Sequence, residues 1–143
     1  MAYCLYTDVE SEFKNLDSTA SGAKVTNTEI GGFITQADAL IDSYLSTRYV
    51  VPVTGSSALS LLKWICIQIV KERVQKIIAV KTGNPELDQD DVDKPMWLLM
   101  LESIQKGGIN LVDAVLLNSG EGFKSGNVEN EISQLFDVAA QQW

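Results

Sequence analysis

The side chains that could do chemistry are few, because the chain of 143 residues contains no histidine and only two cysteines. Histidine is the common general base near neutral pH and a common metal ligand, so His-based triads and His-based metal sites are excluded. A nucleophile at Cys4 or Cys66 would lack its usual base, and two cysteines without histidine do not complete a structural zinc site. The sequence therefore predicts neither an enzyme nor a cofactor.

The two cysteines also lie far apart in the sequence, so they do not form a disulfide framework of the kind that small secreted domains use. Cys66 stands in the apolar run Trp64-Ile65-Cys66-Ile67, which predicts a buried thiol. A reducing environment such as the cytosol is the simpler expectation for this chain.

An acidic run over residues 86–93 is the best candidate for a calcium loop, and it fails the pattern. An EF-hand needs Gly at the sixth loop position and Glu at the twelfth. Counted from Asp88, these positions hold Asp93 and Leu99. The run is interpreted as a solvated linker.

Residues 120–125 show a faint likeness to a phosphate-binding loop. That loop requires Gly directly before Lys, but Phe123 precedes Lys124 here. We interpret the segment as part of a Gly-rich linker over residues 118–127.

The charge balance excludes further classes of partner. Eleven basic residues stand against nineteen acidic ones, giving a net charge of −8. A nucleic-acid footprint and a contact with an anionic membrane both need clustered Lys and Arg. Nineteen acids make some carboxylate pairs inevitable, so such pairs do not indicate a glycosidase. Glu72, with Lys71, Arg73 and Lys76 around it, is expected to form a surface ion pair.

Membrane insertion is not expected either. The longest apolar stretch, residues 59–80, is interrupted by charged and amide side chains, so it cannot be a membrane span. The first eight residues lack the basic and apolar regions of a signal peptide.

The first two helices are predicted from capping boxes, in which a Ser or Thr is followed three residues later by Glu or Gln. Thr7 and Glu10 predict a short helix, and Thr26 and Glu29 predict a longer one over residues 27–48. Apolar residues in the second segment recur at helical spacing. Residues 49–53 follow as an extended segment, because Pro52 disfavours helix before it.

A broad apolar face predicts a long central helix over residues 58–81, with its N-cap supplied by the turn 54–57 and its end at Gly83. Pro95 suits the first turn of a further helix over residues 95–106, which Gly107 stops. A short extended piece, 109–111, follows. The predicted fold class is all-α: a small helical bundle with one long central helix, short extended segments and a C-terminal arm.

The last third of the chain differs from the rest. Residues 113–117 fit a helical turn and a strand equally. Residues 128–143 fit an amphipathic helix and an extended arm equally, and they supply the candidate docking side chains Ile132, Leu135, Phe136 and Trp143. We therefore divide the chain into a helical domain, 1–111, and a flexible linker with a C-terminal arm or helix, 112–143.

An ordered set of residues in the first half resembles a known family. The set comprises the start Met1-Ala2-Tyr3-Cys4, Asp8, the block from Ala37 to Leu45, the pair Arg48-Tyr49, and Pro52. It is similar to the Mu-like prophage structural protein family of phage head–tail connector or adaptor proteins. The similarity covers residues 1–111, including the long helix and the shorter helix that ends at Gly107-Gly108.

The resemblance implies a structural adaptor of a tailed bacteriophage, located at the neck of the virion and made in the host cytoplasm. It implies a homo-oligomeric ring of twelve copies under the portal protein, joined to a tail, stopper or tail-completion protein. DNA would pass through the channel without being read. The alternatives are another virion component, such as a tail-completion protein, and a small acidic metal-dependent enzyme.

Overall fold

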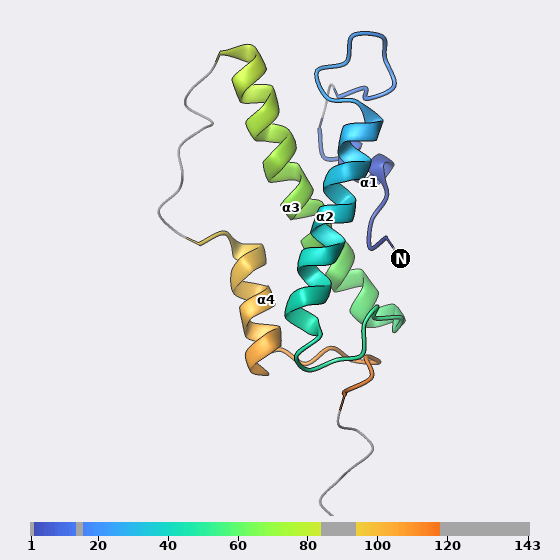
Figure 1. Ribbon diagram of the computed structural model, residues 1–143, viewed down its shortest axis with the longest axis vertical. Helices are drawn as coiled ribbons and strands as arrows, with labels where there is room; N and C mark the ends of the chain where they lie inside the picture. The colour runs from blue at the N-terminus through green and yellow to red at the C-terminus, as the bar shows by residue number, and fades with distance from the viewer. Residues whose placement is uncertain (1, 14–15, 84–93, 118–143) are drawn as a thin grey trace, which may run out of the picture.

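The computed structural model describes residues 2–13, 16–83 and 94–117, and within them the protein is all-α. Four helices follow in the order α1 (Tyr6–Glu10), α2 (Asn27–Leu45), α3 (Ser56–Thr82) and α4 (Met96–Lys106). Figure 1 shows α2 and α3 crossing at the centre, with α1 beside one half of α2 and α4 beside the other half. The predicted small bundle around one long helix is confirmed.

Helix α2 forms because its sequence satisfies its own first turn and repeats its apolar residues at helical spacing. The Thr26 hydroxyl accepts the N–H of Glu29 at 3.2 Å, while the Glu29 carboxylate accepts the N–H of Thr26 at 2.8 Å. The predicted capping box is confirmed. Its buried face consists of residues three or four apart: Ile30, Ile34, Ala37, Ile41 and Leu45. The helix ends at Leu45 rather than 48, because the chain turns there to bury Tyr49.

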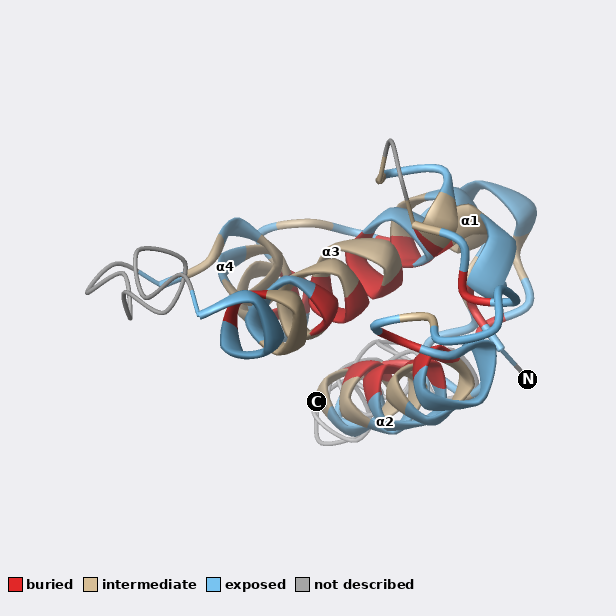
Figure 2. Ribbon diagram, turned by 90° about the horizontal axis from the view of Figure 1, so that it is seen from above, coloured by how far each residue is buried: buried red, intermediate tan, exposed pale blue. Residues whose placement is uncertain are grey.

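The long helix α3 spans 27 residues, or about 40 Å at 1.5 Å per residue. It starts two residues before the predicted position and ends one residue after it, at Gly83 in the left-handed conformation. Figure 2 shows its buried side turned toward α2. The buried residues include Leu62, Ile65, Ile69 and Val74, which give the protein one continuous core.

Helix α4 begins after Pro95 and ends at Gly107, whose φ of 85° is left-handed. Both predicted limits are confirmed within one residue. Leu101 and Ile104 are buried, and α4 packs against α2 and α3.

The predicted capping box of the first helix is wrong. Helix α1 is capped by Leu5, not Thr7, and the Asp8 carboxylate accepts the N–H of Leu5 at 2.9 Å. The Glu10 carboxylate instead accepts the N–H of Ser18 at 2.9 Å and also the Ser18 hydroxyl. Glu10 is therefore used to hold the loop after α1, where a buried Ser18 needs an acceptor.

The N-cap of α3 lies in the predicted turn 54–57, but it is a residue without a side chain. Gly55 occupies the cap position and no side chain of the turn 54–57 caps the helix. The acceptor comes from Asp113, which lies beyond α4 in the sequence.

Candidate interaction surface and the contacts that position it

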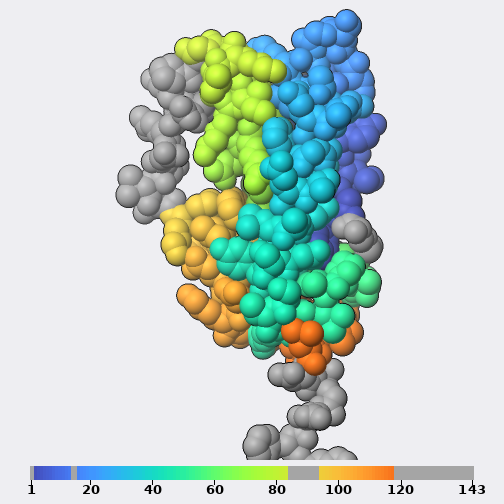
Figure 3. Space-filling model, in the orientation of Figure 1, coloured from blue at the N-terminus to red at the C-terminus, as the bar shows by residue number. Residues whose placement is uncertain are grey.

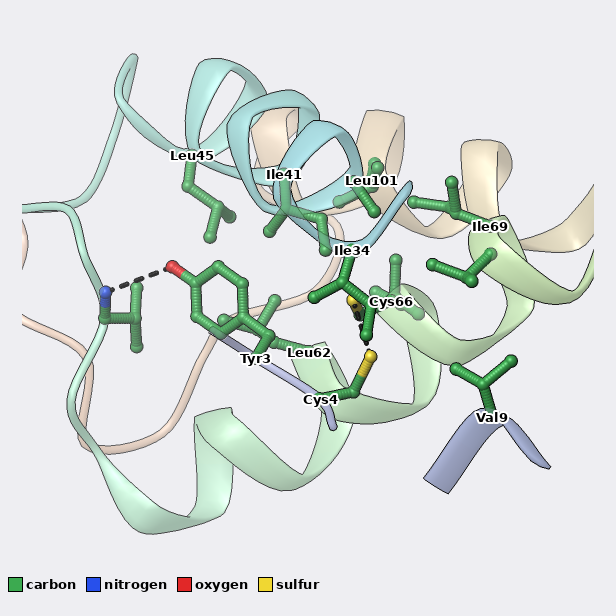
Figure 4. Close-up of a cluster of buried hydrophobic side chains, with 14 of the residues drawn as sticks. Tyr3, Cys4, Val9, Ile34, Ile41, Leu45, Leu62, Cys66, Ile69 and Leu101 are labelled. Carbon is green, nitrogen blue, oxygen red and sulfur yellow. Dashed lines mark hydrogen bonds between the residues drawn. The ribbon is translucent and has the colours of Figure 1, made fainter. Parts of the chain in front are cut away.

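The N-terminal segment is held against α2 by Tyr3. Its N–H donates to Asp38 Oδ1 at 3.1 Å and its hydroxyl donates to Asp42 Oδ1 at 2.5 Å. The same hydroxyl accepts the N–H of Val53 at 3.3 Å, so one side chain joins the N-terminus, α2 and the segment before α3 (Figure 4). Burial and the bond to Asp42 raise the pKa of Tyr3, so the phenol stays protonated and keeps donating.

Next to Tyr3, Cys4 meets Cys66 inside the core. The two Sγ atoms lie 3.0 Å apart and both thiols are free and buried. Cys66 Sγ also lies 3.6 Å from Asp38 Oδ1. Burial raises the pKa of Asp38, against the lowering effect of the bonds from Tyr3 and Cys66. The predicted burial of Cys66 is confirmed, whereas no sequence pattern predicts Cys4 as its neighbour.

Arg48 and Tyr49 hold the segment after α4. The Arg48 guanidinium donates to Asn110 Oδ1 at 2.7 Å and to the Ile104 carbonyl at 3.3 Å. The buried Tyr49 hydroxyl accepts the N–H of Leu111 at 3.1 Å. Because these bonds attach the end of α4 to the end of α2, the geometry of this end of the molecule is fixed by two side chains.

The chain then pairs with residues 48–50 as a short antiparallel bridge. Val50 N–H donates to the Val115 carbonyl at 2.8 Å, and Leu117 N–H donates to the Arg48 carbonyl at 3.0 Å, on either side of a bridge between Tyr49 and Leu116. Residues 113–117 form neither the helical turn nor the strand that we predicted, because Asp113 lies in a turn and Leu116 makes only an isolated bridge. The division of domains at residue 111 stays a prediction.

Asp113 completes this end by capping α3. Its carboxylate accepts the N–H of Ser57 at 3.0 Å, where the positive end of the helix dipole favours an anion. Its φ of 65° is left-handed, which Asp tolerates better than most residues. The backbone of Asp113 lies so close to Gly55 that a Cβ there would stand 2.5 Å from the Asp113 carbonyl oxygen. Gly55 is thus required by a close approach.

Exposed apolar side chains gather at the same end. We define the exit patch as Val50, Val112, Val115 and Leu117, which are 46, 68, 58 and 51% exposed. The backbone bonds of the bridge bring Val50 beside residues 115–117. Figure 3 shows this end, where residues 112–117 (orange) lie beside the segment that follows α2 (green). The patch therefore stands where the described chain ends, and residues 118–143 continue from it.

A second polar contact joins the flank of α4 to α3. Trp97 Nε1–H donates to Glu72 Oε2 at 2.9 Å, and Lys76 lies 3.4 Å from the other Glu72 oxygen. The predicted ion pair of Glu72 is confirmed, and Trp97 packs against the core. Glu72 is thus a structural residue.

The predicted docking residues Ile132, Leu135, Phe136 and Trp143 lie outside the described residues, as do the acidic run 86–93 and the Gly-rich segment 118–127. Within residues 2–13, 16–83 and 94–117, no three Asp, Glu or Cys side chains group as metal ligands. None of the described helices is both long enough and apolar enough to cross a bilayer.

Comparison with known proteins finds one family that is similar to most of the described chain. A family model described as "Bacteriophage Mu, Gp36" matches residues 3–116. The match starts at Tyr3, which ties down the N-terminus, and ends at Leu116, in the bridge to Tyr49. No curated protein matches the chain.

Proposed function

The chain belongs to the bacteriophage Mu Gp36 family, and we propose that it is a structural head–tail connector. In this proposal the protein is an adaptor at the neck of a tailed phage. Copies assemble as a ring of twelve under the portal, join the capsid to the tail, and let DNA pass without reading it. Membership of this family shows a phage protein; a role in virion assembly, and the connector role within it, are the finer steps that we propose.

The observation that carries the proposal is the structural role of the residues through which the sequence resembles phage adaptors. Tyr3, Asp38, Arg48 and Tyr49 all make hydrogen bonds to other parts of the same protein. Such residues keep the protein rigid. A scaffold needs this rigidity, whereas a catalytic role would not explain these contacts.

The exit patch supports a contact with another protein. Its four exposed apolar residues lie at one end of the protein, and exposed apolar patches mark interaction sites. We assign the patch to the portal protein, because the segment 118–143 continues from it and carries the predicted docking residues Ile132, Leu135, Phe136 and Trp143. The exit patch and residues 118–143 would then both bind the portal protein.

The charge supports passage of DNA. With a net charge of −8, the surface repels phosphate at long range, so DNA is not retained. Within the ring, contacts between copies are heterologous, which means that one face of the body meets a different face of its neighbour.

Removal of the protein from a phage that encodes it tests the proposal. Cells that lack the chain should accumulate DNA-filled heads and finished tails that do not join, and supplying the chain in trans should restore joined particles. A chain ending at Asn127 should remain folded and restore joining poorly. Joined, infectious particles without the chain would contradict the connector role, and a defect confined to tails would favour a tail-completion protein.

A further inference from the structure

The fold brings together two thiols that are remote in the sequence. Cys4 is in the N-terminal segment and Cys66 is near the middle of α3, yet their Sγ atoms are 3.0 Å apart (Figure 4). A disulfide needs an S–S distance of about 2.05 Å, so the sulfurs need to approach by only about 1 Å. The segment around Cys4 has no helix of its own to hold it back, because α1 begins at Tyr6.

The hydrogen bonds around the pair show how the thiols are arranged when reduced. An ionised carboxylate can only accept, so the Cys66 S–H donates to Asp38 at 3.6 Å. Cys4 then donates its own S–H to Cys66 Sγ. The two sulfurs therefore already face one another, with no side chain between them.

We propose that Cys4 and Cys66 are a reversible disulfide site, which a small-molecule disulfide such as oxidised glutathione converts into a covalent link between the N-terminal segment and α3. Such a link is absent from the reduced protein, in which both thiols are free.

The reaction is two successive thiol–disulfide exchanges. Cys4 loses its proton, and its thiolate attacks one sulfur of oxidised glutathione, which breaks the glutathione S–S bond and releases one glutathione. Cys66 then loses its proton and attacks the Cys4 sulfur of the mixed disulfide, which releases the second glutathione. The two cysteines give up two electrons and two protons, and the two glutathione thiols receive them.

Access to the thiols governs the rate. Both side chains are buried, and the bond with Cys4 together with burial raises the pKa of Cys66, so neither reacts while the N-terminal segment is closed. Opening requires release of the Tyr3 hydroxyl from Asp42 and Val53. Tyr3 therefore sets how often the oxidant can reach Cys4.

The disulfide should stabilise the folded protein against unfolding, because it closes a long loop between the N-terminal segment and α3. Closing a loop of this size is expected to raise Tm by on the order of 10 °C. If the protein is a connector as proposed, the thiols stay reduced during assembly in the host cytoplasm. The link then forms after release into an oxidising medium.

The test uses the purified full chain, incubated at pH 8 with oxidised glutathione and compared with a sample in dithiothreitol. We expect the intact mass to fall by the mass of two hydrogens, both thiols to disappear on titration in denaturant, and a peptide joining Cys4 to Cys66 to be found. Tm should rise, and dithiothreitol should reverse the change. Tyr3→Phe should oxidise roughly tenfold faster, since the loss of a hydrogen bond of ordinary net strength changes an opening equilibrium by about that factor.

The single variants Cys4→Ala and Cys66→Ala are matched controls, and the oxidant should leave the Tm of each unchanged. The proposal is overturned if wild-type and Tyr3→Phe proteins both keep two free thiols after prolonged oxidation. It is also overturned if they gain glutathione or form covalent dimers instead, or if the internal disulfide lowers Tm. These outcomes are independent of whether the protein is a connector, because no phage particle enters the experiment.

Discussion

The Asp113 carboxylate accepts the backbone N–H of Ser57 at 3.0 Å and so caps a helix that begins far away in the sequence. Helix α3 has no side-chain cap from its own turn, because its N-cap residue is Gly55. The contact links the beginning of the longest helix to the segment that bears the exit patch. Asp113 therefore contributes both to the start of α3 and, together with Arg48 and Tyr49, to the shape of the proposed docking end.

Replacing Asp113 should separate the contributions of hydrogen bonding and charge at this cap. Asp113→Ala loses the acceptor and the charge, and should lower the free energy of unfolding by about 1–2 kcal/mol. Asp113→Asn keeps an acceptor oxygen and tolerates the left-handed φ, so its loss should be about 0.3–1 kcal/mol. Urea unfolding at neutral pH measures both. Equal losses for the two variants would show that the hydrogen bond is not the source of the effect.

Glycine-to-alanine variants should change stability in opposite directions at two sites. Gly31 and Gly32 are inside α2 with nothing within 4 Å of an added Cβ. Gly31→Ala and Gly32→Ala should each raise the free energy of unfolding by about 0.5–1 kcal/mol. Gly55→Ala should lower it, because the new Cβ would stand 2.5 Å from the Asp113 carbonyl oxygen. Thermal unfolding compares all three, and a stabilising Gly55→Ala would refute the close packing at this turn.

Asp38 should make the protein more stable as the pH falls, relative to an uncharged variant. Burial raises its pKa in the folded state, so the folded protein binds a proton more tightly than the unfolded chain does. Stability from this site therefore increases as pH falls through the raised folded pKa toward the unfolded one, and decreases as pH rises through the same window. Asp38→Asn keeps an oxygen for the N–H of Tyr3 and does not titrate.

The measurement is the difference in unfolding free energy between wild-type protein and Asp38→Asn from pH 7 to pH 4. The difference should shift in favour of wild type as the pH falls. Carboxylates with lowered pKa values, such as Asp8, lose their contribution in the same range, but they are present in both proteins and cancel. A difference that is constant, or that shifts against wild type, would contradict the raised pKa.

Charges placed in the exit patch should impair assembly without unfolding the protein. Val115→Glu and Leu117→Glu put a carboxylate on exposed side chains, so stability should change by no more than about 0.5 kcal/mol. Binding to purified portal rings and restoration of joined particles should both fall at least tenfold. Val80→Glu is the matched control, since Val80 is 74% exposed on the last turns of α3, away from the patch. Equal behaviour of all three variants would remove the patch from the proposed contact.

Local signals in the sequence predicted most of the fold. Helix limits followed from Thr26 with Glu29, from Gly83 and from Gly107, because each is a local device that terminates its own helix. Long-range contacts could not be predicted in this way. Asp113 reaches Ser57, and Cys4 reaches Cys66, only after the helices have packed.

The one local signal that failed shows the same limit. Thr7 and Glu10 have the spacing of a capping box, but the Glu10 carboxylate is taken by the buried Ser18 of the following loop. A polar group that burial would otherwise leave without a partner has priority over a cap at a solvent-exposed helix end. The roles of Arg48 and Tyr49 also required the structure, because their partners follow α4 and are far away in the sequence.

Imaging the neck of the assembled phage particle tests the central claim most directly. Averaged cryo-electron microscopy should show a closed ring of this chain between portal and tail, with α2, α3 and α4 fitting each subunit as one rigid body and the exit patch against the portal. Density for the chain at any other place in the particle, or a neck in which no subunit fits it, would contradict the account.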